Sequence, residues 1–411
     1  MEQFYKDPRT PLRMREGPLG AYVDELARQL SEEGYARASA RYALQLVADL
    51  GRWMIRRKFV AAHLNPEHLE RYLKYRSRHR HYRPGDATIV GRLLKLLREK
   101  GIVATAAPIE RTPAQRLEEE FRQYLERERR LAPATVFLYL PFARRFLAEC
   151  FADGELRLNS LRASDVVRFV QREAVRLHYP KRAKLMTTAL RSFLQYARYR
   201  GLIGIDLRSS VPTVASWSMA SLPRALSSDD VQCLLAHCNR HTATGCRNWA
   251  ILLLLARLGL RAGEVVGLTL DDLDWERGEL CIRASGGNFD RLPLPQDVGA
   301  AVADYLRRLR PACSCRQVFV RMKAPHRGFA SSVAISSIVR RALERAGLNP
   351  AHKGAHLLRH SVATHLLRQG ASLAEIGELL RHRNQQTTML YAKVDLDLLR
   401  PLALPWPGGA Q

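Results

Sequence analysis

The sequence predicts a mainly α-helical protein, in which two small helical bundles precede a mixed α/β domain that is mostly helical and contains a small antiparallel sheet. Apolar residues recur at i, i+3 and i+4 through the first half of the chain, which is the pattern of amphipathic helices. Only residues 279–283 and 291–294 resemble strands, and the Gly286-Gly287 turn separates them. A chain of 411 residues is long enough for two or three domains with separate cores.

Two stretches rich in proline and small residues, 104–113 and 209–223, mark the domain boundaries. After the second boundary, the chain is helical apart from the two strands, until a non-helical segment that contains Trp406. The expected parts are an extra N-terminal helical domain at 1–105, a second helical domain at 112–204, the mixed domain at 222–400 and a C-terminal tail at 401–411.

The two helical domains resemble each other with a period close to 100 residues. The segment Arg98-Glu99-Lys100-Gly101-Ile102 aligns with Arg198-Tyr199-Arg200-Gly201-Leu202, and the apolar positions before it also correspond. Only two copies occur, so we interpret them as a duplicated bundle and not as a solenoid, which needs at least three repeats.

The charge of the chain predicts a polyanionic partner. Lys and Arg number 66 against 40 Asp and Glu, which gives a net charge of +26; such a surface favours nucleic acid or an anionic membrane. The most apolar run, Ile251 to Leu255, is far shorter than the ~20 residues that span a bilayer, and no signal peptide opens the chain. The seven cysteines are scattered, which is typical of reduced thiols. We therefore expect an intracellular protein that binds nucleic acid and no membrane.

The segment 71–83 interleaves six Lys or Arg residues with three tyrosines, as surfaces that follow a phosphate backbone do. By itself a solvated helix face explains this segment equally well, and the overall charge favours DNA. The expected DNA-binding side chains in the two bundles are Arg71, Lys74, Arg76, Arg78, Arg182, Lys184 and Arg191.

Four segments of the mixed domain carry groups suited to phosphoryl transfer. Arg261 follows an apolar helix, and His356 and Arg359 lie at i and i+3 on one helix face. Guanidinium groups bind the non-bridging oxygens of a phosphate and neutralise charge that develops on phosphorus. Further along the chain, the imidazole of His382 can transfer a proton, and the phenol of Tyr391 is a candidate nucleophile.

These segments read Gly259-Leu-Arg261-x-x-Glu264, His356-x-Leu-Arg359-His360 and Leu380-Arg381-His382 with Tyr391 nine residues later. They resemble the signature boxes of the tyrosine recombinases, the phage-integrase family, in a mobile-element type with an extra N-terminal domain. The resemblance implies a core-binding (SAM-like) domain and a catalytic domain that together clamp double-stranded DNA, in a cytoplasmic, nucleoid-associated protein.

The resemblance also implies a mechanism of site-specific DNA recombination, in integration or transposition. Arg261, His356, Arg359 and His382 would surround the scissile phosphate. Tyr391 would attack it, form a 3′-phosphotyrosyl link and release a 5′-hydroxyl, without ATP, metal or cofactor. Family members act as tetramers on paired sites, so we expect a homo-tetramer or an assembly with sibling recombinases.

Two positions depart from the family pattern. Ser285 stands where relatives carry a lysine that protonates the leaving oxygen. One general acid contributes about 10²–10⁴-fold, so its loss slows cleavage without erasing the site; Arg283, Arg291 or Lys353 are alternative cations. Arg381 replaces a glycine, and we expect it at a solvent-facing helix end.

Three other interpretations fit the same residues: a catalytically impaired DNA-binding partner of sibling recombinases, a non-catalytic architectural protein, and a type IB topoisomerase, which shares the same groups. A zinc site is not expected among His352, His356, His360 and His365, because no glutamate lies inside a pair and Arg359 would repel a cation. We expect His360 and His365 to be hydrogen-bonded helix residues.

Overall fold

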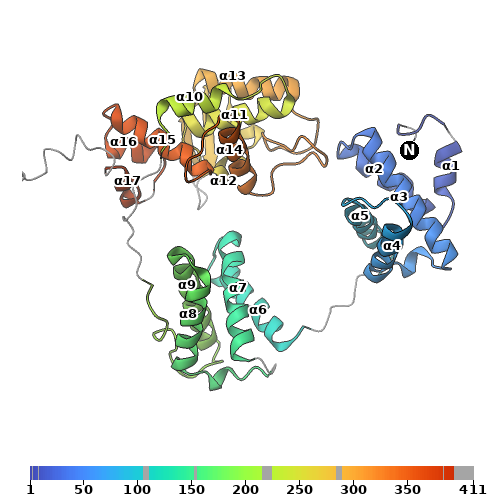
Figure 1. The fold of residues 1–411 in the computed structure, drawn as a ribbon, viewed down its shortest axis with the longest axis horizontal. Helices are drawn as coiled ribbons and strands as arrows, with labels where there is room; N and C mark the ends of the chain where they lie inside the picture. The colour runs from blue at the N-terminus through green and yellow to red at the C-terminus, as the bar shows by residue number, and fades with distance from the viewer. Residues whose placement is uncertain are drawn as a thin grey trace, which may run out of the picture. The chain divides into compact units, whose positions relative to one another are not determined.

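The computed structural model describes residues 1, 3–7, 9–104, 111–151, 155–214, 225–283, 289–382 and 384–392. Ser285, the Gly286-Gly287 turn and the tail 401–411 with Trp406 lie outside the described residues. The described residues are mainly helical, with one three-stranded antiparallel sheet (Figure 1). The chain forms two compact units, 106–220 and the remainder. None of the helices in the described ranges is long and apolar enough to cross a membrane.

The first 104 residues form a helical bundle around a core of their own. In its central helix, buried residues recur at helical spacing, as at Ala40, Ala43, Val47 and Leu50. This spacing places one apolar face against the neighbouring helices. The helices are α1 (Arg9–Arg15), α2 (Gly20–Glu32), α3 (Arg37–Arg56), α4 (Pro66–His79) and α5 (Asp86–Glu99), with a 3-10 turn η1 (Ala61–His63) before α4.

The unit at 106–220 repeats the order of α2 to α5, as the sequence similarity predicts, and has no counterpart of α1 among its described residues. Its helices are α6 (Pro113–Gln123), α7 (Pro133–Cys150), α8 (Ala163–Leu177) and α9 (Pro180–Tyr199), with a 3-10 turn η3 (Leu158–Ser160) before α8. The last helix of each bundle ends in the same way. Gly101 (φ +70°) follows α5 and Gly201 (φ +69°) follows α9, both in the left-handed region that glycine adopts without a steric cost.

The mixed domain is built around α11 (Ala243–Arg257). The run from Ile251 to Leu255 is buried throughout, and each such side chain contributes about 1.5–3 kcal/mol. Its other elements are α10 (Ser228–Ala236), α12 (Ala262–Gly267), β1 (Leu273–Asp274), β2 (Glu279–Arg283), β3 (Phe289–Pro293), α13 (Gln296–Asp304), α14 (Val333–Arg345), α15 (Ala355–Arg368), α16 (Leu373–Leu379) and α17 (Gln385–Ala392).

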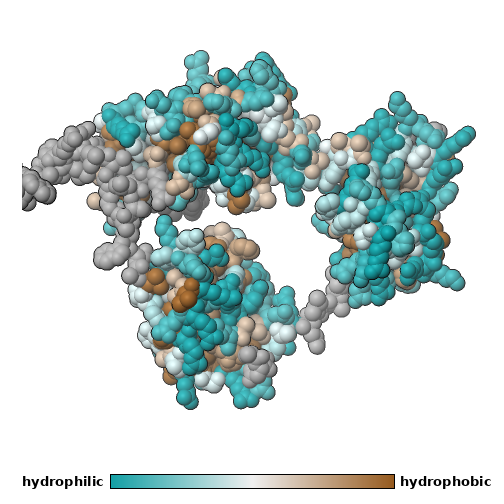
Figure 2. All heavy atoms as spheres, in the orientation of Figure 1, coloured by the Kyte–Doolittle hydropathy of each residue, from teal (hydrophilic) through white to brown (hydrophobic). Residues whose placement is uncertain are grey.

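The hairpin of β2 and β3 confirms the two predicted strands, and Leu280 pairs with Leu292 in it. The sequence pattern did not predict β1, which has only two residues and pairs with the start of β2. A capping box formed by Ser227 and Asp230 starts α10, as the Ser227-Ser228-Asp229-Asp230 sequence ahead of an apolar run indicates. On the face shown in Figure 2, hydrophilic residues cover most of the described surface, and apolar residues form small separate patches.

Candidate active site

Arg261 is positioned by a sharp turn at the end of α11. Gly259 has a φ of +57° there, and a Cβ on Gly259 would lie 2.6 Å from Cδ2 of Leu380. Any other side chain would therefore meet both backbone strain and a steric clash at this position. The turn packs the start of the signature segment at Gly259 directly against the one that begins at Leu380.

Glu264 holds two guanidinium groups in place. Its Oε1 accepts a hydrogen bond from Nη1 of Arg261 at 2.7 Å, and its Oε2 accepts one from Nη2 of Arg381 at 2.9 Å. The backbone N–H of Arg261 donates to the same carboxylate. Burial alone would raise the pKa of Glu264, but the bond from the Arg261 backbone and the charge of Arg381 outweigh it and lower this pKa. Glu264 is thus a carboxylate that orients Arg261.

Arg381 does not lie at a solvent-facing helix end, so that expectation is wrong. Its side chain is only 7% exposed and forms the ion pair with Glu264, and its Nη1 donates to the carbonyl of Leu379 at 2.9 Å. Its backbone has a φ of +54°, which costs a non-glycine residue roughly 1–2 kcal/mol. This conformation gives a physical reason why a glycine suits the position.

We expect Arg381→Gly to be more stable than Arg381→Ala by about 1 kcal/mol, because both lose the ion pair and only glycine adopts the left-handed conformation freely. Hydrogen exchange in α16 and α17 of the full chain measures the difference. The control pair is Arg57→Gly and Arg57→Ala, at a helix end with a φ of −101°, where glycine has no such advantage. Equal protection in the two Arg381 variants would contradict the left-handed backbone.

Arg359, on α15, connects the signature segment that begins at Gly259 with the one that begins at Leu380. Its buried guanidinium donates to the carbonyl of Gly259 at 2.6 Å and to the carbonyl of Leu380. Burial, followed by the positive charges of Arg261 and Arg381, lowers its pKa to about 10. Arg359 is therefore still charged at neutral pH, and its position is fixed by two backbone carbonyls.

A cavity of about 450 Å³ opens beside these groups, and Arg261 and His356 both line it. Burial, followed by the positive charges of Arg359 and Arg261, lowers the pKa of His356. Of the three cations considered as replacements for the family lysine, Arg283 lines this cavity. Its Nε lies 3.5 Å from Oδ1 of Asp272, whereas Arg291 pairs with Glu279 on the hairpin.

Tyr391 lies between two imidazole rings. Its side chain is buried, and its Oη shares a 2.8 Å hydrogen bond with Nδ1 of His360. The ring of His382 stacks on it with centroids 6.3 Å apart, while Nδ1 of His382 bonds Oγ1 of Thr388 at 2.7 Å. Burial raises the pKa of Tyr391. Burial, then the charges of Arg359 and Arg261, lower the pKa of His382 to about 4.

His360 contacts the candidate nucleophile, a role that the sequence did not reveal. The prediction of a hydrogen-bonded helix residue is confirmed, but its partner is 31 residues away on another helix. The sequence did contain one indication that His360 lies at the site. It follows Arg359 directly and comes four residues after His356, and residues at i and i+4 share a helix face.

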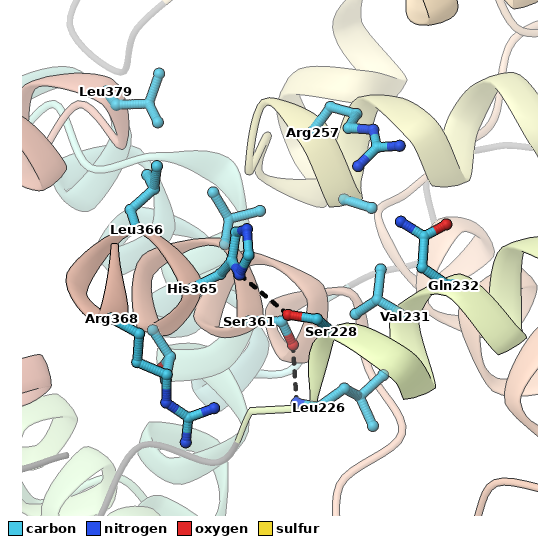
Figure 3. Close-up of a pocket in the computed structure, with 13 residues that line it drawn as sticks. Leu226, Ser228, Val231, Gln232, Arg257, Ser361, His365, Leu366, Arg368 and Leu379 are labelled. Atoms are coloured by element: carbon cyan, nitrogen blue, oxygen red, sulfur yellow. Dashed lines mark hydrogen bonds between the residues drawn. The ribbon is translucent and has the colours of Figure 1, made fainter. Parts of the chain in front are cut away.

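His365 has a different partner, which Figure 3 shows. Its Nδ1 bonds Oγ of Ser228 at 3.0 Å, and the N–H of Leu226 donates to Oγ of Ser361 at 2.8 Å. These bonds join α15 to the start of α10, beside a second cavity of about 180 Å³. His365 is thus a hydrogen-bonded helix residue, as predicted.

The predicted DNA-binding side chains separate into two groups. Arg71, Lys74, Arg78, Arg182 and Lys184 are exposed and remain predictions. Arg76 is a correction, because its buried guanidinium pairs with Asp86 at 3.0 Å and Asp49 at 3.2 Å. Two carboxylates already neutralise it, so it is not available to a phosphate. Arg191 is half-buried and donates to the carbonyls of Val211 and Pro212.

Comparisons with known proteins identify the family of the chain. The model of the phage integrase family matches residues 224–397. The chain is 47% identical over 403 residues to y4rA of Sinorhizobium fredii, named as an integrase/recombinase, with 97% of each chain covered. It is 32% identical over 283 residues to the tyrosine recombinase XerA of Thermococcus kodakarensis, covering 69% of this chain and 92% of XerA.

Two crystal structures share the fold. The XerH site-specific recombinase bound to palindromic difH substrate, in a post-cleavage complex, matches with a TM-score of 0.56 and 19% identity, over 82% of this chain and 94% of that one. A lambda integrase tetramer bound to a Holliday junction matches with a TM-score of 0.50 and 16% identity, over 72% of this chain and 88% of that one.

The matching family model and relatives place the chain in the phage integrase family, the tyrosine recombinases. It is a tyrosine site-specific recombinase, an enzyme of DNA recombination and integration.

Proposed function

We propose that Arg261, His356, Arg359 and His382 surround the scissile phosphate and that Tyr391 is the nucleophile. Oη of Tyr391 forms a bond to phosphorus, and the bond from phosphorus to the 5′ oxygen breaks. The 3′-phosphotyrosyl link keeps the energy of the phosphodiester, so a 5′-hydroxyl can reseal the strand without ATP. The observation that carries this proposal is the buried Tyr391 phenol within hydrogen-bonding distance of an imidazole on the helix that bears Arg359.

The guanidinium groups stabilise the charge that develops on the phosphate. Arg359 is anchored by two carbonyls and Arg261 by Glu264, so both are oriented before DNA binds. Donors that are oriented in advance lose no energy to reorganisation during the reaction. Arg283, which lines the same cavity as Arg261 and His356, supplies positive charge in place of the family lysine that is missing from the sequence. Arginine is too weak an acid to replace that lysine fully, so we expect slow cleavage.

The two helical bundles and the mixed domain act as three domains, 1–105, 112–204 and 222–400, and extend along DNA. The exposed cations of the bundles support this arrangement, because Lys and Arg beside phosphates release counterions. The lambda integrase with the same fold forms a tetramer on a Holliday junction. We infer a homo-tetramer on paired sites for this chain as well, or an assembly with sibling recombinases, acting in the cytoplasm where the DNA lies.

Replacing Tyr391 by phenylalanine is expected to abolish a covalent protein–DNA adduct, because phenylalanine has no nucleophilic oxygen. The substrate is a nicked suicide duplex that carries a site selected from random DNA by binding to this protein. The adduct is measured on denaturing gels, and a binding assay shows that the variant still holds the site.

An adduct with Tyr391→Phe, or no adduct with the unaltered chain on a bound site, would refute the assignment of the nucleophile. The second result would favour the impaired DNA-binding partner that the missing lysine suggests. Relaxation of supercoiled DNA without recombination between paired sites would instead favour a topoisomerase.

A further inference from the structure

Nδ1 of His360 shares a hydrogen bond of 2.8 Å with Oη of Tyr391. The two rings belong to different helices, α15 and α17, and their centroids lie 5.5 Å apart at an angle of 57°. His382 also lies beside Tyr391, but its ring is nearly parallel to the phenol with the centroids 6.3 Å apart, and its Nδ1 bonds Thr388 instead. The geometry therefore distinguishes the two imidazoles that flank the phenol.

The surroundings of His360 favour a neutral ring that can accept a proton. Burial, then the neighbouring His356 and the charge of Arg359, lower the pKa of His360. The groups around it are His356 and Arg359 on α15, Tyr391 on α17 and His382 just before α17. Burial raises the pKa of Tyr391, so the phenol keeps its proton at neutral pH until a base removes it.

We propose that Nδ1 of His360 accepts the proton of the Tyr391 phenol as Oη attacks phosphorus, which makes His360 a catalytic residue in addition to the family set. As the Oη–phosphorus bond forms, the phenolic proton moves to Nδ1. The bond between phosphorus and the 5′ oxygen breaks with its electron pair on that oxygen, which takes a proton from water. In resealing, the 5′-hydroxyl gives its proton back to the solvent and bonds to phosphorus, the bond between phosphorus and Oη breaks, and His360 returns its proton to Oη of Tyr391.

The proposal requires a particular tautomer. Nδ1 can accept a proton only when the neutral ring carries its hydrogen on Nε2. In this tautomer the phenol donates to Nδ1, and the hydrogen bond also holds Oη in place before attack. The proposal rests on Tyr391 as the nucleophile, the function proposed above.

Two variants separate positioning from proton transfer. Asparagine places an amide near the position of Nδ1 and keeps a hydrogen bond without basicity, whereas alanine removes both. We expect His360→Ala to slow single-turnover adduct formation by about 10²-fold or more, and His360→Asn by about tenfold or more. The rate of the unaltered chain should fall with decreasing pH as His360 becomes protonated, and His360→Asn should lack this dependence.

A substrate with sulfur in place of the 5′ bridging oxygen identifies which proton transfer is affected. A thiolate leaves without protonation, so this substrate rescues the loss of a group that protonates the leaving atom. We expect it to leave His360→Ala as impaired as before, because the phenol still needs a base. Rescue to the rate of the unaltered chain would overturn the proposal, as would a rate for His360→Ala on the ordinary substrate within about threefold of that chain.

His365→Gln is the matched control on the same helix. His365 bonds Ser228 and makes no contact with Tyr391 among the described interactions, so its replacement should leave the rate unchanged. The outcomes also separate the two proposals. If the unaltered chain forms no adduct, the assignment of Tyr391 fails. If it forms the adduct and His360→Ala forms it equally fast, only the role of His360 fails.

Discussion

Arg359→Lys is expected to slow strand cleavage by about 10²–10³-fold while DNA binding changes little. The guanidinium of Arg359 bonds the backbone carbonyls of Gly259 and Leu380, which belong to the other two signature segments. An ammonium group is a point charge and cannot bond both carbonyls while it also faces a phosphate. The variant keeps the charge but loses the orientation, and orientation is what stabilises the transition state.

The measurement for Arg359→Lys is single-turnover adduct formation, with affinity for the same duplex measured in parallel. Arg257→Lys is the matched control, since Arg257 forms an exposed ion pair with Asp297 at 2.9 Å and exposed pairs contribute little. Cleavage by Arg359→Lys at the rate of the unaltered chain would show that charge alone suffices at this position.

Asp86→Ala is expected to destabilise the N-terminal bundle by about 3–5 kcal/mol, because it removes one partner of a buried ion pair. Asp86 is completely buried and accepts hydrogen bonds from Oη of Tyr42 at 2.6 Å and Nε of Arg76 at 3.0 Å. Without it, the buried Arg76 keeps Asp49 as its remaining carboxylate partner. The cost arises from an incompletely paired charge away from water.

Hydrogen exchange of α3, α4 and α5 in the full chain measures the effect of Asp86→Ala, because exchange reports local stability in a protein of several domains. Asp24→Ala is the control: Asp24 pairs with Arg15 at the surface, so its loss should cost less than about 1 kcal/mol. Unchanged protection in Asp86→Ala would mean that the bundle does not depend on this pair.

Much of the candidate site could be predicted from local pattern. The order and spacing of Arg261, His356, Arg359, His382 and Tyr391 along the chain are sufficient to indicate the family. Their chemical roles remain predictions, which the adduct and rate measurements test. The shared orientation of His356 and Arg359 on one helix follows from the helical period.

Contacts between distant segments could not be predicted in this way. Arg381 and Glu264 are 117 residues apart, and the sequence showed only that an arginine replaced a glycine. Arg76 could not be predicted for the same reason. It lies in a run of basic residues, and its neighbours Lys74 and Arg78 are exposed whereas Arg76 is buried. Whether such a side chain meets a phosphate or a carboxylate depends on which helix packs beside it.

The sequence by itself determined the family, the order of the helices, the capped start of α10 and the glycine-terminated ends of α5, α9 and α11. These features depend on neighbours within a few residues, where backbone geometry and side-chain periodicity decide the structure. Only the tertiary structure decided that Arg381 and Arg76 are buried ion-pair partners and that His360 touches Tyr391. The helical period fixes the face on which a side chain lies, but only packing brings a partner from elsewhere in the chain to that face.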